Sequence, residues 1–240
     1  MLRFLPIQTF GAEALARALE LSPEGGMVLM VVAGLLVAVV AYFLGSVNGA
    51  ILVSHVLLRR DIRAHGSHNA GTTNMLRTYG TKYAVLTMVL DMLKAVVATL
   101  IGYAVAALMG AAIAGFFCVL GHMFPVFYRF RGGKGVATTA MVALMLDPWT
   151  FLVMFVVFFA IVGMSRYVSL ASVMCAFLYP LLLHAFCPVS GWVPLMGLCT
   201  SAFVVFMHRE NLKRLYRGEE SKISFSRKKK SEQSDGEGKA

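Results

Sequence analysis

A polar stretch between long apolar runs carries the residue types best suited to binding an anion. Residues 66–77 read Gly-Ser-His-Asn-Ala-Gly-Thr-Thr-Asn-Met-Leu-Arg. The glycines let the backbone approach a ligand closely and leave N–H groups free to point at a negative charge. Arg77, at the end of the stretch, can hold a phosphate through two parallel hydrogen bonds. An ordinary polar loop between two membrane helices is the alternative interpretation. Further donors are the side chains of Ser67, Asn69, Thr72, Thr73 and Asn74.

A second glycine-rich stretch, residues 132–135, reads Gly-Gly-Lys-Gly and precedes an apolar run that we expect to be a helix. The unpaired N–H groups and the positive end of a helix N-terminus attract anions, and Lys134 adds a charge. The stretch lacks the spacing and the Ser or Thr of a Walker A loop, so nucleotide hydrolysis is not indicated. Together with Arg77, it predicts a site for more than one phosphate group.

Several ionisable side chains elsewhere also need an explanation. His208 and Asn211 are three residues apart, so they can face one site from the same side of a helix. Asp91 and Lys94 have the same spacing inside an apolar run, where an ionisable group is costly and usually faces a partner or a cavity. They form either a buried structural pair or part of a site. A lone histidine such as His122 is more often structural than catalytic.

These residues must be positioned by helices in a membrane. The chain has 240 residues, of which 58% are hydrophobic and 14% charged, whereas an average globular domain is about 25% charged. Long apolar runs predict an all-α integral membrane protein. We expect residues 1–26 to be an extension with the mixed character of an interfacial helix or a loose end, 27–210 a transmembrane domain, and 211–240 a basic tail. The apolar runs predict about seven spans, at residues 27–58, 83–108, 110–128, 136–146, 149–164, 168–186 and 192–207.

The distribution of basic residues predicts an orientation. Lys and Arg collect in residues 59–82, 129–134, 165–166 and the C-terminal tail, and seven crossings place all of these on one side. The positive-inside rule assigns that side to the cytoplasm and the N-terminus to the outside. This topology requires a tight turn between two helices at Asp147-Pro148. A single kinked helix there is the alternative, and it would reverse the later topology.

Other classes of site have no signature in the sequence. No Gly-x-Ser-x-Gly elbow marks a serine nucleophile. The carboxylates of the spans and loops are far apart and the four cysteines lack metal-ligand spacing, so no metal or other cofactor is predicted. The net charge of +10 points to orientation and anionic partners rather than to nucleic acid. The sequence defines no oligomeric state.

The motifs together resemble the bacterial acyl-phosphate:glycerol-3-phosphate acyltransferase family. The resemblance extends from about residue 45 to residue 223. The chain departs from the family pattern at His68, Thr72 and Ala95, where the family usually has glycine, alanine and glycine. The matching motifs are Gly-Ser at 45–46, Asp-Ile-Arg at 61–63, Gly-Ser-x-Asn-x-Gly-x-Thr-Asn-x-x-Arg at 66–77, Asp-x-Leu-Lys at 91–94, Gly-His-x-Phe-Pro at 121–125, Gly-Gly-Lys-Gly-Val-Ala-Thr at 132–138, Val-Ser-Leu-Ala-Ser at 168–172 and His-Arg-Glu-Asn at 208–211.

The resemblance implies a reaction between two phosphate-bearing substrates, glycerol 3-phosphate and a long-chain acyl phosphate held in membrane lipid. Lysophosphatidic acid and inorganic phosphate would form by direct attack, without an acyl-enzyme, at the cytoplasmic face of the bacterial inner membrane. Glu210 is expected to hold the fold. A transporter of a phosphorylated solute is the alternative function, but its polar groups should lie near the midplane. The implied catalytic residues are Ser67, Arg77, Lys134, His208 and Asn211, and the implied substrate-binding residues are Asn69, Gly71, Thr73, Asn74, Lys94, Gly132, Gly133 and Ser172.

Overall fold

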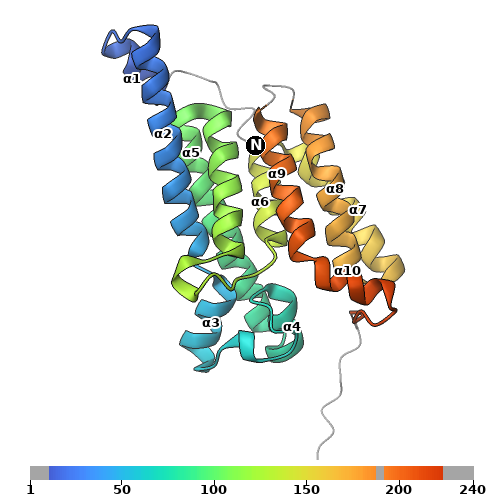
Figure 1. Ribbon diagram of the computed structural model, residues 1–240. Helices are drawn as coiled ribbons and strands as arrows, with labels where there is room; N and C mark the ends of the chain where they lie inside the picture. Colours follow the sequence, from blue (N-terminus) through green and yellow to red (C-terminus); the bar gives the residue numbers. More distant parts are fainter. Residues whose placement is uncertain (1–10, 188–191, 224–240) are drawn as a thin grey trace, which may run out of the picture.

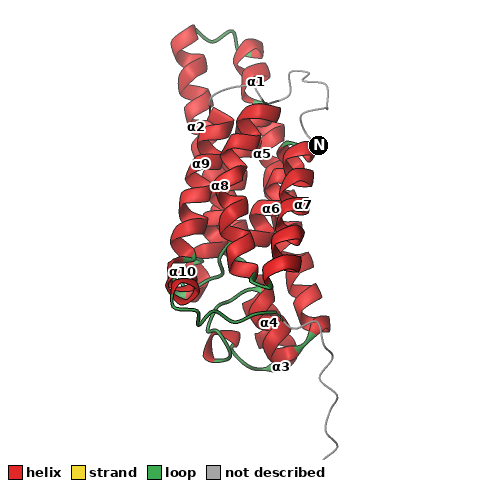
Figure 2. Ribbon diagram, turned by 90° about the vertical axis from the view of Figure 1, so that its right-hand side faces the viewer, coloured by secondary structure: helices red, strands yellow, loops and turns green. Residues whose placement is uncertain are grey.

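A computed structural model of the chain describes residues 11–187 and 192–223. Every regular element in these ranges is a helix, and the long helices form an elongated bundle (Figures 1 and 2). Two single 3₁₀ turns, Ile62–Ala64 and Val126–Tyr128, lie in connecting loops. The helices are α1 (Ala12–Ala18), α2 (Pro23–Ser46), α3 (Gly49–Leu58), α4 (Thr72–Tyr79), α5 (Thr81–Met123), α6 (Val136–Leu146), α7 (Pro148–Ser165), α8 (Val168–Phe186), α9 (Trp192–Met207) and α10 (Arg209–Tyr216).

Helix α5 is a hairpin of two antiparallel limbs. The backbone leaves helical geometry at Ala106 and Ala107, and the second of these has a positive φ of 47°. A Cβ on Gly102 would lie 2.2 Å from the carbonyl oxygen of Gly110, so only glycine permits the limbs to approach this closely. The reversal falls where the sequence predicted a boundary between two apolar runs, and both limbs are helical as expected.

The first predicted span is broken in its C-terminal third. Helix α2 stops at Ser46 and α3 starts at Gly49, with extended backbone at Val47 and Asn48. The Asn48 side chain accepts a hydrogen bond from Ile51 N (3.0 Å) and so caps α3, while its Nδ2 donates to Ala70 O (3.2 Å). The fully buried amide therefore ties this break to the polar loop that follows α3.

The turn predicted at Asp147-Pro148 is present and separates two helices. Asp147 ends α6 and caps α7 by accepting a hydrogen bond from Thr150 N (2.8 Å), and Pro148 occupies the first helical position. The loop before α6 and Arg166 after α7 lie at the same end of the bundle, because both contact the C-terminal segment 208–223. The chain thus turns back at Asp147, and the kinked-helix alternative is wrong.

Some of the helices are long and apolar enough to cross a membrane. Among the described residues, four helices are long and apolar enough to cross a membrane, or five when α9 and α10 count as one span bent by 55°. The α5 hairpin is one of these four, as the segment Thr81–Tyr128. Helix α6 has 11 residues, which gives about 16 Å at 1.5 Å per residue, short of the roughly 30 Å hydrocarbon core. The structure therefore supports a polytopic helical membrane protein.

A buried cluster of Asp91, Lys94 and His122 joins the two limbs of α5. Lys94 Nζ lies 2.8 Å from Asp91 Oδ1 and 3.0 Å from His122 Nδ1, and Asp91 Oδ1 lies 3.3 Å from the same ring nitrogen. All three side chains are more than nine-tenths buried. Asp91 and Lys94 are therefore the buried pair that the sequence allowed, and His122 is its third member.

The same cluster also holds the α2–α3 break. Lys94 Nζ donates to the carbonyl oxygens of Gly45 (3.0 Å) and Val47 (2.9 Å), which the end of α2 leaves without helical partners. Asp91 Oδ1 accepts a hydrogen bond from Gly49 N (3.0 Å) at the start of α3. The Lys94 ammonium is thus engaged inside the bundle with four neighbouring groups rather than presented to a substrate.

We expect Lys94→Met to destabilise the protein by about 3–5 kcal/mol, because it leaves the Asp91 carboxylate buried and unpaired. Adding Asp91→Asn should recover part of this loss by removing that charge. Thermal unfolding in detergent measures both effects. Lys82→Met, at an exposed lysine near the start of the same helix, is the control and should change little. A double variant as unstable as the sum of the two single variants would show that the pair is not coupled.

Candidate functional site

The polar loops that are distant in sequence meet at one end of the bundle, the end with α3, α4 and α10 in Figure 1. Arg63 Nη1 donates to Tyr128 O (2.8 Å), which joins the first loop to the loop before α6. Arg63 also pairs with Asp61 at 2.9 Å, and this pair lowers the pKa of the Asp61 carboxyl. The prediction that these loops lie at the same end of the protein is confirmed.

Asn74 organises the loop formed by residues 61–71. Its Nδ2 donates to the carbonyl oxygens of His65 (2.9 Å) and Asn69 (3.0 Å), and its Oδ1 accepts from Ser67 N (2.9 Å). Gly66 has a φ of 60°, and a Cβ there would lie 2.3 Å from Asn74 Oδ1. The buried amide of Asn74 is therefore used within the loop, and it positions the neighbouring donors rather than presenting a free group.

The remaining residues predicted in this loop lie around its rim. Ser67 and Arg77 are exposed, whereas Asn69, Gly71 and Thr73 are half-buried. His68 has a left-handed backbone, with a φ of 58°, and its Nδ1 contacts Arg63 O at 3.1 Å. A glycine would adopt this conformation without strain, which explains physically why His68 is an unusual residue at this position.

The glycines of residues 132–135 serve close packing. Gly132 N donates to Met123 O and Gly133 N donates to His122 O, each at 3.1 Å. A Cβ on Gly133 would lie 2.2 Å from His122 Nε2, so the loop lies directly against the buried cluster. The expectation that these two N–H groups face an anion is wrong, because both are already bonded to carbonyl oxygens of the protein.

The N-terminus of α6 retains the features of an anion site. Gly135 precedes the helix with a φ of 77°, and no side chain caps this end. Thr138, in the first turn, is fully buried, and its hydroxyl has no hydrogen-bond partner among the described residues. Free N–H groups of the first turn are thus supplied by the residues after the glycines rather than by the glycines.

Lys134 contacts Asn211, one of the two residues of the predicted His208 and Asn211 pair. Its Nζ donates to Asn211 Oδ1, and Asn211 Nδ2 donates to Glu220 Oε1 (2.7 Å). Burial lowers the pKa of Lys134 to about 8; Glu220 opposes this shift, and Arg214 and Arg77 add to it. A half-buried cation beside an amide at a helix start can bind a phosphate oxygen.

Glu220 is the member of the site that the sequence analysis missed. Besides Asn211, it accepts hydrogen bonds from Ser169 Oγ (2.8 Å) and Arg214 Nε (2.9 Å). Burial raises the pKa of the Glu220 carboxyl, but the hydrogen bonds from Asn211, Ser169 and Arg214 outweigh it and lower the pKa overall. An acidic pair, residues 219–220, within an otherwise basic tail was the available signal.

Residues 217–223, which we call the strap, fold back across the mouth of the bundle. Arg77 Nη2 donates to Ser221 O (3.0 Å), and Ile223 N donates to Arg166 O (2.9 Å). The predicted tail therefore begins with structured residues, α10 followed by the strap, whereas residues 224–240 lie outside the described ranges. Arg77 reaches the other predicted site residues through this strap.

His208 lies between α9 and α10 and is buried. Its Nδ1 is 2.7 Å from Val204 O, so that nitrogen carries the proton, and Nε2 is left as an acceptor. Ser172 is buried on α8, and its hydroxyl bonds to Val168 O (2.8 Å) in its own helix. Glu210, expected to hold the fold, is instead exposed and forms a surface pair with Lys213 (3.1 Å) that contributes little to stability.

Comparison with known proteins agrees with this arrangement. The sequence pattern of the family described as glycerol-3-phosphate acyltransferase matches residues 35–218. The glycerol-3-phosphate acyltransferase of Finegoldia magna is 36% identical over 192 residues, covering 79% of this chain and 96% of that protein. The one from Syntrophomonas wolfei is 40% identical over 186 residues, covering 78% of this chain and 95% of the relative.

The architecture is likewise similar to solved structures. The crystal structure of PlsY, described as an integral membrane glycerol 3-phosphate acyltransferase in its glycerol 3-phosphate form, superimposes with a TM-score of 0.74 at 36% identity, covering 80% of this chain and 96% of that one. A lysophosphatidic acid form of PlsY gives a TM-score of 0.73 at 35% identity. On its fold, its polar site and these matches, the chain belongs to the glycerol-3-phosphate acyltransferase family of integral membrane enzymes.

Proposed function

We propose that this acyltransferase moves a fatty acyl group from an acyl phosphate to the sn-1 hydroxyl of glycerol 3-phosphate. The new ester bond forms as the acyl–phosphate bond breaks, which gives lysophosphatidic acid and inorganic phosphate. The observation that carries the proposal is the junction of Lys134, Asn211 and Arg77 at one end of an apolar bundle. The glycerol 3-phosphate and lysophosphatidic acid forms of PlsY support the acceptor and the product by analogy.

The site has separate means of holding two phosphate groups. Lys134 and the free first-turn N–H groups of α6 form one positive site. Arg77, with the donors Ser67, Asn69 and Thr73 on the rim of the first loop, forms the other. Asn74, Lys94, Gly132 and Gly133 then act indirectly, since their polar groups fix the loops.

Catalysis would depend mainly on positioning and charge stabilisation, because acyl phosphate is already activated. No acyl-enzyme and no cofactor are needed for direct attack. The proton of the attacking hydroxyl has two possible acceptors, His208 Nε2 and the phosphate of the donor. His208 suits the role because its Nδ1 bond to Val204 O leaves Nε2 as an acceptor.

We further propose seven crossings, with the N-terminus outside and the site facing the cytoplasm of a bacterial inner membrane. The clustering of the basic loops at the end that carries the site supports this orientation. In this arrangement α6 would cross at a locally thinned part of the bilayer or beside other helices. Membership of the acyltransferase family favours an enzyme over a transporter of a phosphorylated solute.

The donor is tested with purified protein, glycerol 3-phosphate and either palmitoyl phosphate or palmitoyl-coenzyme A. We expect phosphate release with palmitoyl phosphate alone, dependent on glycerol 3-phosphate and equal to the lysophosphatidic acid formed. Turnover only with the coenzyme A thioester would overturn the proposed donor while leaving the family assignment intact.

The pKa of Lys134 predicts a pH dependence. Lys134 is positively charged below its pKa of about 8 and neutral above it. The kcat/KM for glycerol 3-phosphate should therefore fall as the pH rises through about 8. Lys134→Arg keeps the charge at higher pH, so its alkaline limb should move upward. Lys213→Arg, at an exposed position of α10, is the control. A Lys134→Arg profile identical to that of the wild type would argue against a role for this charge.

His208→Ala distinguishes the two proton acceptors. If His208 is the base, kcat should fall by about 10²–10⁴-fold in a sample whose thermal unfolding in detergent shows that it is still folded at the assay temperature. His184→Ala, at an exposed position of α8, controls for loss of a histidine. Near-normal kcat with only a raised KM for glycerol 3-phosphate would assign the proton to the donor phosphate.

A further inference from the structure

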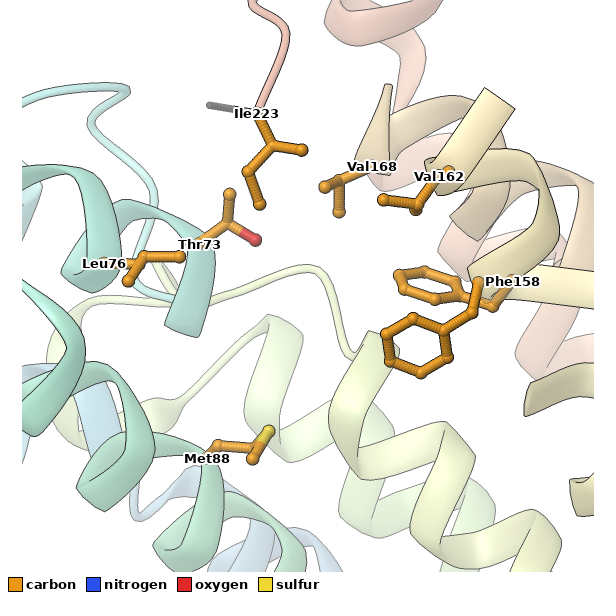
Figure 3. Close-up of a pocket in the computed structure, with 9 residues that line it drawn as sticks. Thr73, Leu76, Met88, Phe158, Val162, Val168 and Ile223 are labelled. Atoms are coloured by element: carbon orange, nitrogen blue, oxygen red, sulfur yellow. The ribbon is translucent and has the colours of Figure 1, made fainter. Parts of the chain in front are cut away.

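An apolar cavity of about 400 Å³ opens beside the polar site. Figure 3 shows Thr73 and Leu76 of α4 facing Phe158 and Val162 of α7 across it. Met88 of α5 lies at the opposite side of the space from Ile223. Such a volume is within the roughly 300–1,000 Å³ typical of small-molecule sites. Apart from the Thr73 hydroxyl, the lining side chains are apolar, so the cavity suits a hydrocarbon.

The cavity is continuous with the residues that would hold a phosphate. Thr73 lines it and belongs to the first loop and α4, one helical turn before Arg77. Ile223 lines it from the strap, and Ser221 of the same strap is bonded to Arg77. Val168 lines it one residue before Ser169, whose hydroxyl bonds to Glu220. A ligand with an anionic head at Arg77 could therefore extend an apolar tail into this space.

We infer that this cavity binds the acyl chain of the donor and of the lysophosphatidic acid product, and that Gly163 and Ile223 determine which chains it accepts. The inference rests on the proposed function and extends it to chain selection. Ile223 belongs to the strap, so the strap contributes one wall of the cavity.

Gly163 lines the cavity from α7 and has no side chain to occupy it. A Cβ at this position would meet no atom within 4 Å, so a larger side chain fits there without a clash. Phe158 and Phe159, about one turn earlier on α7, also line the cavity. A leucine at residue 163 would occupy volume that a long acyl chain needs, whereas a short chain would still fit.

Chain-length profiles test this directly. Octanoyl and palmitoyl phosphates are compared in wild type, Gly163→Leu and Ile223→Ala. Gly163→Leu should lower kcat/KM for palmitoyl phosphate by roughly 10-fold relative to octanoyl phosphate, the scale of a one- or two-methylene misfit in an apolar pocket. Ile223→Ala should raise the KM for palmitoyl phosphate. The KM for glycerol 3-phosphate should stay unchanged in Gly163→Leu, because residue 163 contacts none of the phosphate-binding residues. Ala160→Leu, exposed on the same helix and outside the lining, is the matched control.

A binding measurement separates this inference from the proposed donor. Lysophosphatidic acid with a diazirine in its acyl chain should label Met88, Phe158 or Phe159 in the wild type, and labelling should drop in Gly163→Leu. If acyl phosphate is turned over but the profile of Gly163→Leu equals that of Ala160→Leu, the cavity is not the acyl site. If acyl phosphate is not turned over, labelling elsewhere in the bundle would overturn the inference, and labelling at these residues would support it.

Discussion

Asp91, Lys94 and His122 form an ion-paired cluster inside the apolar bundle, where the α2–α3 break meets both limbs of α5. Burying charges in an apolar bundle is expensive, and it is tolerated only when every charge has partners. Here the ammonium of Lys94 is surrounded by a carboxylate, a ring nitrogen and two carbonyl oxygens. The cluster fixes four pieces of backbone at once: the end of α2, the start of α3 and the two limbs of α5.

Both loops of the site are built on that fixed point. On one side, Asn48 at the α2–α3 break holds Ala70 in the first loop. On the other side, His122 O accepts a hydrogen bond from Gly133 N. The His122 ring also lies so close to Gly133 that a side chain at residue 133 would clash with it. Charge and close packing thereby set the separation of the two loops, which suits the proposed reaction between two phosphate-bearing substrates.

The third part of the site, around Asn211, lies nearer the surface. Lys134, Asn211 and Glu220 form a chain of polar contacts that ends on α8 and on the strap. The strap crosses from Arg77 to Arg166, and its Ile223 faces the apolar cavity. One short segment thus touches both the region that binds charge and the region suited to hydrocarbon. For a substrate with a charged head and an apolar chain, binding of the head and binding of the chain would be coupled through the strap.

The sequence alone determined the helical membrane architecture, the α6–α7 turn and the gathering of polar loops on one side. These follow from local causes: long apolar runs favour membrane helices, Asp147-Pro148 ends one helix and begins another, and lysines and arginines avoid the hydrocarbon. The motif residues also identified the family, because their order along the chain is itself specific. The hydrogen-bond partner of each motif residue was not encoded in that order, which is why Lys94 and Asn74 were expected to contact substrate.

Which polar atoms remain available to a ligand depends on how distant segments pack together. Lys94, Asn74, Gly132 and Gly133 have the chemistry of ligand-binding residues, but neighbouring segments use their donors. Glu220 is the opposite case, because no sequence motif placed it in the site. It joins the site because the chain folds back onto α8. Hydrogen-bond partners are set by contacts between segments far apart in sequence, and local patterns carry no information about those contacts.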